Sequence, residues 1–272
     1  MHERVFVHSE FFTPAQSEFV LVSLDFPQGE EAKAAVPNPK RNEELMGKYG
    51  VRGFPTVMIV EADGTALGQT GYRDMDPADY LADVKKIRDA GRKALSAIRE
   101  IEAEYASAED KLAVANKACE LLGEMSSESP GVSVLADILR ESMKLTDKAK
   151  VQIKFLSAIM SSTAPTAADR EMAEKLDPKN ENGLLFKLLM VKMNNLSSIE
   201  DVADFGVQAE AVWATGNVEA SEDSLTVMVS CAFFYKEYLS DADLAKTWAE
   251  RAVAQGGLDE RMQEVIDSIL AE

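Results

Sequence analysis

Apolar residues in the first third of the chain occur in short, nearly continuous runs. One run covers Phe19–Asp25 and is followed by Pro27, and a second covers Thr56–Val60. Runs of this length without alternating polar positions are typical of strands that are buried on both faces. We therefore predict two buried strands, the first of them an interior parallel strand, joined by a polar, proline-containing connection.

The residues between and after these runs predict a helix and a hairpin. Apolar spacing over Asn42–Tyr49 fits a short helix that ends near Gly50. Asp63 and Gly64 follow the second strand and are suited to a hairpin turn. Because the turn reverses the chain, Ala66–Tyr72 is expected to return antiparallel to the second strand.

A long helical pattern follows the hairpin. Asp76 suits the N-cap position, Pro77 the first helical position and Asp79 the first turn. The pattern is expected to be interrupted at Gly91, and the domain boundary is placed on or near this helix, which gives domains of residues 1–90 and 91–272. The apolar positions that carry the helix are Leu81, Val84, Ile87, Leu95, Ile98 and Ile101.

From Lys111 onward the apolar spacing is helical, and no segment has the pattern of a strand. Glycine, proline, serine or asparagine separates the helical segments. Short amphipathic helices in series bury their apolar stripes by stacking on their neighbours. The predicted helices cover Lys111–Met125, Val132–Lys144, Asp147–Met160, Ala167–Leu176, Gly183–Met193, Ile199–Ala214, Asp223–Leu239, Asp241–Ala254 and Asp259–Leu270.

Local signals mark two of these helix boundaries. Ser197–Glu200 has the pattern of a capping box, and Asp177 and Pro178 are predicted to end one helix and to begin the next. The segment Ala173–Asn180 resembles the junction between tetratricopeptide repeats, but no regular period of about 34 residues occurs. A tetratricopeptide-like, all-α helical-repeat domain and an irregular helical bundle both stay open. Small residues of the kind that repeat packing uses are Ala245, Ala249 and Ala252.

Composition limits the classes of function. The chain has 272 residues, of which 46% are hydrophobic and 28% charged, and this balance suits two globular domains. The net charge of −18 repels phosphate backbones at long range, so we expect no nucleic-acid partner. No apolar run is long enough for a membrane span. Because Met1–Glu10 has no pattern of an export signal, the chain as written is expected in the cytoplasm.

The segment Gly50–Thr56, followed by a strand and a glycine-containing hairpin, is similar to the part of thioredoxins that carries their cis-proline. In that family, backbone groups of the proline loop pair with an extended substrate. The resemblance implies an α/β thioredoxin-like fold for residues 1–90 and a cis peptide bond before the proline; a trans-proline that begins a strand is the alternative. The substrate-binding residues that it implies are Gly53, Phe54, Pro55 and Thr56.

The same resemblance implies a gap. Met1–Phe6 looks like the tail of the helix that carries a Cys-x-x-Cys pair in exported bacterial thioredoxin-like proteins. The dithiol and the central strand of the sheet would then precede Met1, in a longer product that is periplasmic or secreted. The alternative is a domain that starts here, with its two parallel strands paired directly through the intervening helix.

The residues present offer little catalytic chemistry. Thiol–disulfide exchange needs an attacking thiolate and a resolving thiol beside it. Cys119 and Cys231 lie on apolar faces of separate predicted helices, so both are expected to pack in the core. His2 and His8 lack a third metal ligand. We therefore assign no catalytic residue, no metal and no cofactor. The hairpin glycines, which do not form a phosphate loop, are Gly64, Gly68 and Gly71.

Aromatic and methionine side chains of the helical region either pack in its core or line a groove for a partner helix. Helical spacing favours core packing. The residues concerned are Phe186, Met190, Met193, Trp213, Phe233, Phe234, Tyr235, Tyr238 and Trp248.

Two classes of function follow, and both involve a protein or peptide partner. In the first, the natural protein is related to thiol–disulfide oxidoreductases, and its helical domain selects or positions the partner. In the second, a non-catalytic thioredoxin-like module and helical repeats form a protein-binding scaffold. Neither class is decided by the fold alone.

Overall fold

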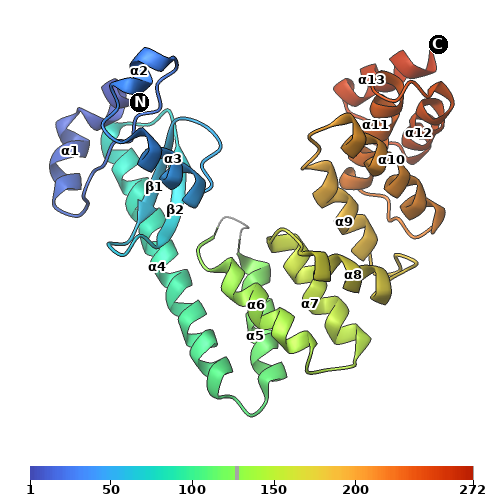
Figure 1. The fold of residues 1–272 in the computed structure, drawn as a ribbon, viewed down its shortest axis with the longest axis horizontal. Helices are drawn as coiled ribbons and strands as arrows, with labels where there is room; N and C mark the ends of the chain where they lie inside the picture. Colours follow the sequence, from blue (N-terminus) through green and yellow to red (C-terminus); the bar gives the residue numbers. More distant parts are fainter. Residues whose placement is uncertain (126–128, 272) are drawn as a thin grey trace. The chain divides into compact units, whose positions relative to one another are not determined.

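The computed structural model describes residues 1–125 and 129–271 (Figure 1). The described chain is mostly helical and contains a small two-stranded sheet. It divides into two compact units, one formed by Met1–Ser107 with a short segment that ends at Val134, and the other by the remaining residues. Both parts of the predicted fold class, a sheet-containing region and a helical region, are therefore present. The thioredoxin-like fold and the boundary at residue 90 stay predictions.

The sheet-containing unit begins with helices. A π-helical turn, η1 (His2–Phe6), is followed by three short α-helices, the sheet and one long helix. The elements are α1 (Ser9–Gln16), α2 (Glu30–Ala34), α3 (Pro39–Lys48), β1 (Thr56–Val60), β2 (Ala66–Gly71) and α4 (Pro77–Ser107).

The hairpin forms as the sequence predicts. β1 pairs antiparallel with β2, with Thr56 opposite Gly71 and Ile59 opposite Gly68, and a register shift follows at Val60. The Asp63 carboxylate accepts a hydrogen bond from the backbone N–H of Thr65 at 2.8 Å, which fixes the turn. The second predicted strand, the return strand and the helix near residues 42–49 are thus confirmed.

The first predicted strand is wrong. Residues 18–27 have no regular secondary structure, and Val20 is 91% exposed and Val22 74% exposed. A strand is stable only when a neighbouring strand satisfies its backbone groups. Within the described residues the sheet contains β1 and β2 alone, so this apolar run has no strand beside it. Direct pairing of the two parallel strands, the alternative from the sequence, does not occur either.

The predicted interruption at Gly91 is also wrong, because α4 continues through it without a break. Gly91 is buried, and a Cβ atom there would overlap the carbonyl oxygen of Leu67 in β2. The missing side chain lets the backbone of α4 lie directly against the hairpin. Gly91 therefore serves close packing between helix and sheet.

The core of this unit joins its helices to the hairpin. Tyr80 on α4 is fully buried beside Phe6 and Phe11, with ring centroids 6.0 and 6.1 Å away. Its hydroxyl donates to the Gly71 carbonyl at 3.2 Å, and burial raises the pKa of Tyr80 to about 12. Glu18 pairs with Lys85 and Arg88 of α4 and fixes the end of α1. The buried residues are Val5, Phe11, Ala15, Ile59, Leu67, Tyr80, Leu81 and Val84.

The rest of the chain forms the predicted series of helices. Each predicted helix is present, with ends that agree to within two residues, because each segment carries its own apolar stripe and its own terminating residues. They are α5 (Lys111–Glu124), α6 (Val132–Met143), α7 (Ala149–Ser162), α8 (Ala167–Leu176), α9 (Leu184–Met193), α10 (Ile199–Ala214), α11 (Glu222–Glu237), α12 (Ala242–Gln255) and α13 (Glu260–Leu270).

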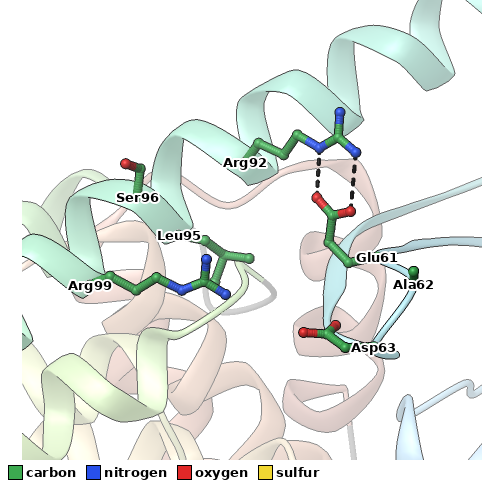
Figure 2. A pocket seen from close by; sticks show the side chains of 7 residues that line it. All are labelled: Glu61, Ala62, Asp63, Arg92, Leu95, Ser96 and Arg99. Carbon is green, nitrogen blue, oxygen red and sulfur yellow. Dashed lines mark hydrogen bonds and ion pairs between the residues drawn. The ribbon is translucent and has the colours of Figure 1, made fainter.

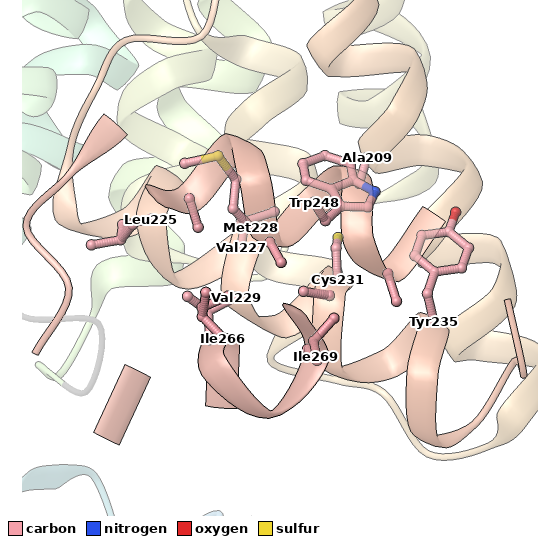
Figure 3. Packing of buried hydrophobic residues seen from close by; sticks show 14 of the residues in the cluster. Ala209, Leu225, Val227, Met228, Val229, Cys231, Tyr235, Trp248, Ile266 and Ile269 are labelled. Carbon is pink, nitrogen blue, oxygen red and sulfur yellow. The ribbon is translucent and has the colours of Figure 1, made fainter. Parts of the chain in front are cut away.

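These helices pack in order along the chain. From α7 to α13 each helix contacts the next one, and the odd-numbered helices α5, α7, α9, α11 and α13 also contact one another in turn. Side chains from α9 to α13 form one continuous core, part of which Figure 3 shows. Trp248 is fully buried in it, with its ring centroid 4.9 Å from that of Trp213. Phe186, Met190 and Met193 pack against the same core.

Two predicted helix boundaries need correction. The N-cap of α10 is Ser198, one residue later than the predicted box, and its side chain accepts from the N–H of Asp201. The Asp201 carboxylate accepts from the N–H of Ser197 and not from that of the N-cap residue, so the reciprocal bond of a capping box is replaced by one to the preceding residue. Pro178 does not begin a helix, because residues 178–183 form a turn. The Asp177 carboxylate accepts hydrogen bonds from the backbone N–H groups of Asn182 and Leu184, and so caps the start of α9 across that turn.

Candidate functional site

The candidate site is the loop that leads into β1. The Phe54–Pro55 peptide bond is cis, as the sequence predicts. Thr56 begins β1, and its hydroxyl donates to the carbonyl of Gly53 at 2.7 Å, which closes the loop on itself. Opposite the loop, a Cβ atom on Gly71 would lie 3.2 Å from the Pro55 carbonyl, so the hairpin packs tightly beneath it. The four predicted substrate-binding residues thus form one loop at the start of β1. Gly53, Phe54 and Pro55 are exposed.

The side chain of Phe54 makes a contact that the sequence did not predict. Phe54 is 62% exposed, and its ring stacks on that of Phe26 with centroids 5.0 Å apart and planes at 28°. Phe26 immediately follows the exposed apolar run, so the stack joins that run to the proline loop. The site is thus an open surface with an aromatic pair at its edge. The contact between the two rings holds the proline loop against the segment that contains Phe26.

The first unit contains no cysteine, so no thiol of that unit lies beside the proline loop. Both cysteines belong to the second unit and are buried, as predicted. Burial raises the pKa of the Cys119 thiol, although Lys154 opposes the shift. Burial raises the pKa of the Cys231 thiol far more. Because the thiolate is the reactive form, neither group is suited to attack a disulfide in the folded protein.

The histidines lie outside any cluster of ligands. His8 is exposed, and its Nε2 atom lies 3.1 Å from the Glu3 carbonyl oxygen. Among the residues that the structure describes, no group of three His, Cys, Asp or Glu side chains is placed to hold a metal ion. Nor does any described helix have the length and apolarity that crossing a membrane requires.

A hollow of about 450 Å³ lies between α4 and the hairpin turn, as Figure 2 shows. Arg92 donates two hydrogen bonds to Glu61 across it, at 2.6 and 3.1 Å, and this contact lowers the pKa of Glu61. Because each charge already has a partner, this pair fastens the hairpin to α4. The remaining lining residues are Ala62, Asp63, Leu95, Ser96 and Arg99.

Sequence reasoning did not single out this hollow. The signal that could have found it is the spacing of Arg92, Ser96 and Arg99, which places all three on one face of a helix. The acidic partners on the hairpin could not be assigned, because their proximity depends on how α4 packs on the sheet.

Comparison with known proteins relates part of the chain to a reductase. The disulfide bond reductase DsbH of Chlamydia pneumoniae is 33% identical to it over 87 residues. The match covers 31% of this chain and 50% of the relative, so the chain spans about half the length of that curated protein. No protein-family model matches the chain, and no solved structure matches it. The similarity supports a region related to thiol–disulfide oxidoreductases of the thioredoxin-like kind.

Proposed function

We propose that the first unit provides the substrate-binding part of a thiol–disulfide reductase of the thioredoxin-like kind. The observation that carries the proposal is the proline loop, Gly53–Thr56, at the start of β1. In this arrangement the exposed backbone of the loop pairs with an extended segment of a disulfide-bearing protein. The 33% identity with a disulfide bond reductase agrees with this chemistry.

The redox dithiol is not among these 272 residues, whose two cysteines are single and buried. We therefore propose that it lies on a segment encoded upstream in the same reading frame, together with a strand. Two features support a missing strand. Residues 20–24, which are apolar except for Ser23, are exposed and without regular structure, and β1 has a strand on one side only within the described chain. A strand inserted between residues 20–24 and β1 would pair with the backbone of each of them.

The test compares this chain with a version extended upstream in its own reading frame. The codons before Met1 are read first, because an in-frame Cys-x-x-Cys is required. Reduction of insulin disulfides is then followed by turbidity with dithiothreitol as the reductant. The proposal expects turnover by the extended chain and only the background rate with the 272-residue chain. An upstream stop codon, or an extended chain without activity, would overturn it.

The two native cysteines provide the matched control. In the extended chain, Cys119→Ala together with Cys231→Ala should leave the reduction rate unchanged, because both thiols are buried and have raised pKa values. Loss of activity in this variant, with an unchanged circular dichroism spectrum, would assign the chemistry to the helical unit instead.

The second candidate is a non-catalytic scaffold for protein binding. The observation in its favour is that no thiol of the first unit accompanies the proline loop. The alternate-helix contacts of α5, α7, α9, α11 and α13 are those of stacked helix pairs, which supports a tetratricopeptide-like surface for a protein partner. Inactivity of the extended chain would favour this candidate.

A further inference from the structure

The helical unit carries a local excess of positive charge on an acidic chain. The whole chain has 47 acidic and 29 basic residues, yet the sequences of α7 and α9 contain lysines and no acidic residue. The two helices contact each other, and α5 contacts α7. A surface whose charge is opposite to that of the whole chain is suited to a ligand of negative charge. The lysines are Lys150 and Lys154 on α7 and Lys187 and Lys192 on α9, of which Lys192 pairs with Asp204.

Two of these lysines hydrogen-bond to neutral oxygens instead of carboxylates. Lys154 Nζ on α7 donates to Asn116 Oδ1 on α5 at 2.8 Å. Lys187 Nζ on α9 donates to Ser161 Oγ on α7 at 2.5 Å. Neither ammonium group forms an ion pair with a carboxylate of the described chain. Each cation is therefore held in place by a neighbour that does not neutralise its charge.

The two cations lie along one face of α7. Lys154 and Ser161 are seven residues apart, which is two helical turns, so both lie on the same side of the helix. Because Lys187 Nζ bonds to Ser161, the two ammonium groups are roughly 10 Å apart along the axis of α7. Lys150 continues the same side of α7 by one turn. We call Lys150, Lys154, Ser161 and Lys187 the lysine face.

The charge of Lys187 is held in an unfavourable position. Lys187 is half-buried, and burial lowers the pKa of its ammonium group, although Asp223 in the first turn of α11 opposes the shift. A carboxylate that binds beside Lys187 would compensate this charge where water screens it less than at an open surface. The gain from binding an anion is therefore expected to be larger at Lys187 than at the exposed Lys154.

We propose that the lysine face binds an extended acidic segment of a partner protein, with carboxylates three residues apart. In polyproline II conformation, residues i and i+3 lie on one side of the segment about 9 Å apart, which matches the spacing of the two cations. A protein segment is favoured over nucleic acid, because a phosphate on every nucleotide is repelled by the net charge of −18. This inference rests on the second candidate function and gives its helical surface a class of partner.

The test is the binding of an amidated peptide, Ser-Pro-Glu-Ser-Pro-Glu-Ser-Pro, labelled with rhodamine at its N-terminus, to the 272-residue chain. Fluorescence anisotropy is measured at low ionic strength and again at 0.15 M salt, where charges are screened within about 8 Å. The proposal expects saturable binding that weakens as salt is added. Replacing one glutamate of the peptide by glutamine should weaken binding about fivefold, and replacing both should abolish it.

Methionine variants of the protein remove each charge and keep the aliphatic stem. Lys187→Met should weaken binding of the peptide about fivefold, and Lys154→Met about threefold. Lys246→Met is the matched control, because Lys246 is exposed on α12 and the variant has the same net charge, and it should bind like the wild type. Lys187→Met should also leave the midpoint of thermal unfolding unchanged or raised, since a half-buried charge is removed, so its loss of binding does not reflect loss of the fold.

Three results would overturn the proposal. They are the absence of saturable binding, an equal effect of Lys187→Met and Lys246→Met, and tighter binding of a single-stranded oligonucleotide than of the peptide to the same lysines. The peptide has no disulfide and the assay has no redox step. Failure here is therefore distinct from failure of the reductase proposal, and the scaffold candidate keeps its own test in the activity of the extended chain.

Discussion

The two units differ in how completely each covers its own apolar surface. In the helical unit, side chains from α9 to α13 enclose Trp248 completely, and its neighbours come from several helices (Figure 3). In the sheet-containing unit, a small core lies beside an exposed run at residues 20–24. A helix satisfies its backbone internally, whereas a strand depends on a neighbour. Helices in series can therefore complete a core locally, while a sheet that lacks a neighbouring strand leaves apolar surface uncovered.

The largest expected effect is in the core of the helical unit. Trp248→Ala should lower the free energy of unfolding by about 3–5 kcal/mol, because a fully buried indole is removed and a cavity remains. Urea unfolding followed by circular dichroism measures this. Val22→Ala in the exposed run should change stability by less than about 0.5 kcal/mol. Equal losses in the free energy of unfolding for Trp248→Ala and Val22→Ala would contradict the difference between the two units.

The next effect concerns the Arg140–Asp169 ion pair, which joins α6 to α8 at 2.9 Å. Asp169 is 3% exposed; desolvation works to raise the pKa of its carboxyl, but hydrogen bonds from Arg140 and Thr166 outweigh it and lower that pKa. Asp169→Asn should cost about 2–3 kcal/mol, because it leaves the Arg140 charge with weaker compensation. Urea unfolding at neutral pH measures the loss, and Asp137→Asn, at the exposed partner of Arg140, is the control with little effect.

The same pair predicts a pH dependence. The folded-state pKa of Asp169 lies below its unfolded value, so the stabilisation is complete above about pH 4 and is lost as the pH falls through the folded-state pKa. Wild-type stability should therefore fall, as the pH drops below about 4, more steeply than that of Asp169→Asn. Parallel pH profiles for the two proteins would contradict this assignment.

Gly91→Ala tests the contact between helix and sheet. The added Cβ atom would overlap the Leu67 carbonyl, so the variant should destabilise the first unit by about 1–3 kcal/mol. Gly123→Ala in α5 is the matched control, because nothing lies within 4 Å of the new atom, and it should stabilise the helical unit by about 0.5–1 kcal/mol. Hydrogen exchange of amides in β2 and α5 measures both. A neutral Gly91→Ala would mean that α4 does not lie against β2.

The smallest effect is at a helix cap. Ser198→Ala removes the oxygen that accepts from the Asp201 N–H and should cost about 1 kcal/mol. Ser198→Asp keeps a side-chain acceptor and should therefore cost only a few tenths of a kcal/mol. Fluorescence-detected urea unfolding is suited to this measurement, because both tryptophans, Trp213 and Trp248, belong to the helical unit.

The helices could be predicted because each carries its period and its end signals locally. Ile199–Ala214 was predicted with the bounds that the structure has, whereas the strand at Phe19–Asp25 was wrong because its apolar run depends on a neighbour that the described chain does not supply. Gly91 was misread for a similar reason, since only the packed structure shows the Leu67 backbone against it.

The candidate site was predicted in part. A family resemblance in Gly50–Thr56 predicted the cis bond, which the structure contains. The Phe26–Phe54 stack and the Arg92–Glu61 pair could not be predicted, because residues 28 and 31 positions apart meet only after folding. The role of Gly53–Thr56 in binding substrate stays a prediction.

The most direct measurement of the central claim is hydrogen exchange at residues 20–24 in this chain and in the version extended upstream, at concentrations where both are monomeric. The account predicts rapid exchange in the 272-residue chain and strong protection in the extended chain, because the added strand pairs with this segment and with β1. Rapid exchange in both would contradict it, since the upstream segment would then complete neither the sheet nor a reductase site beside Pro55.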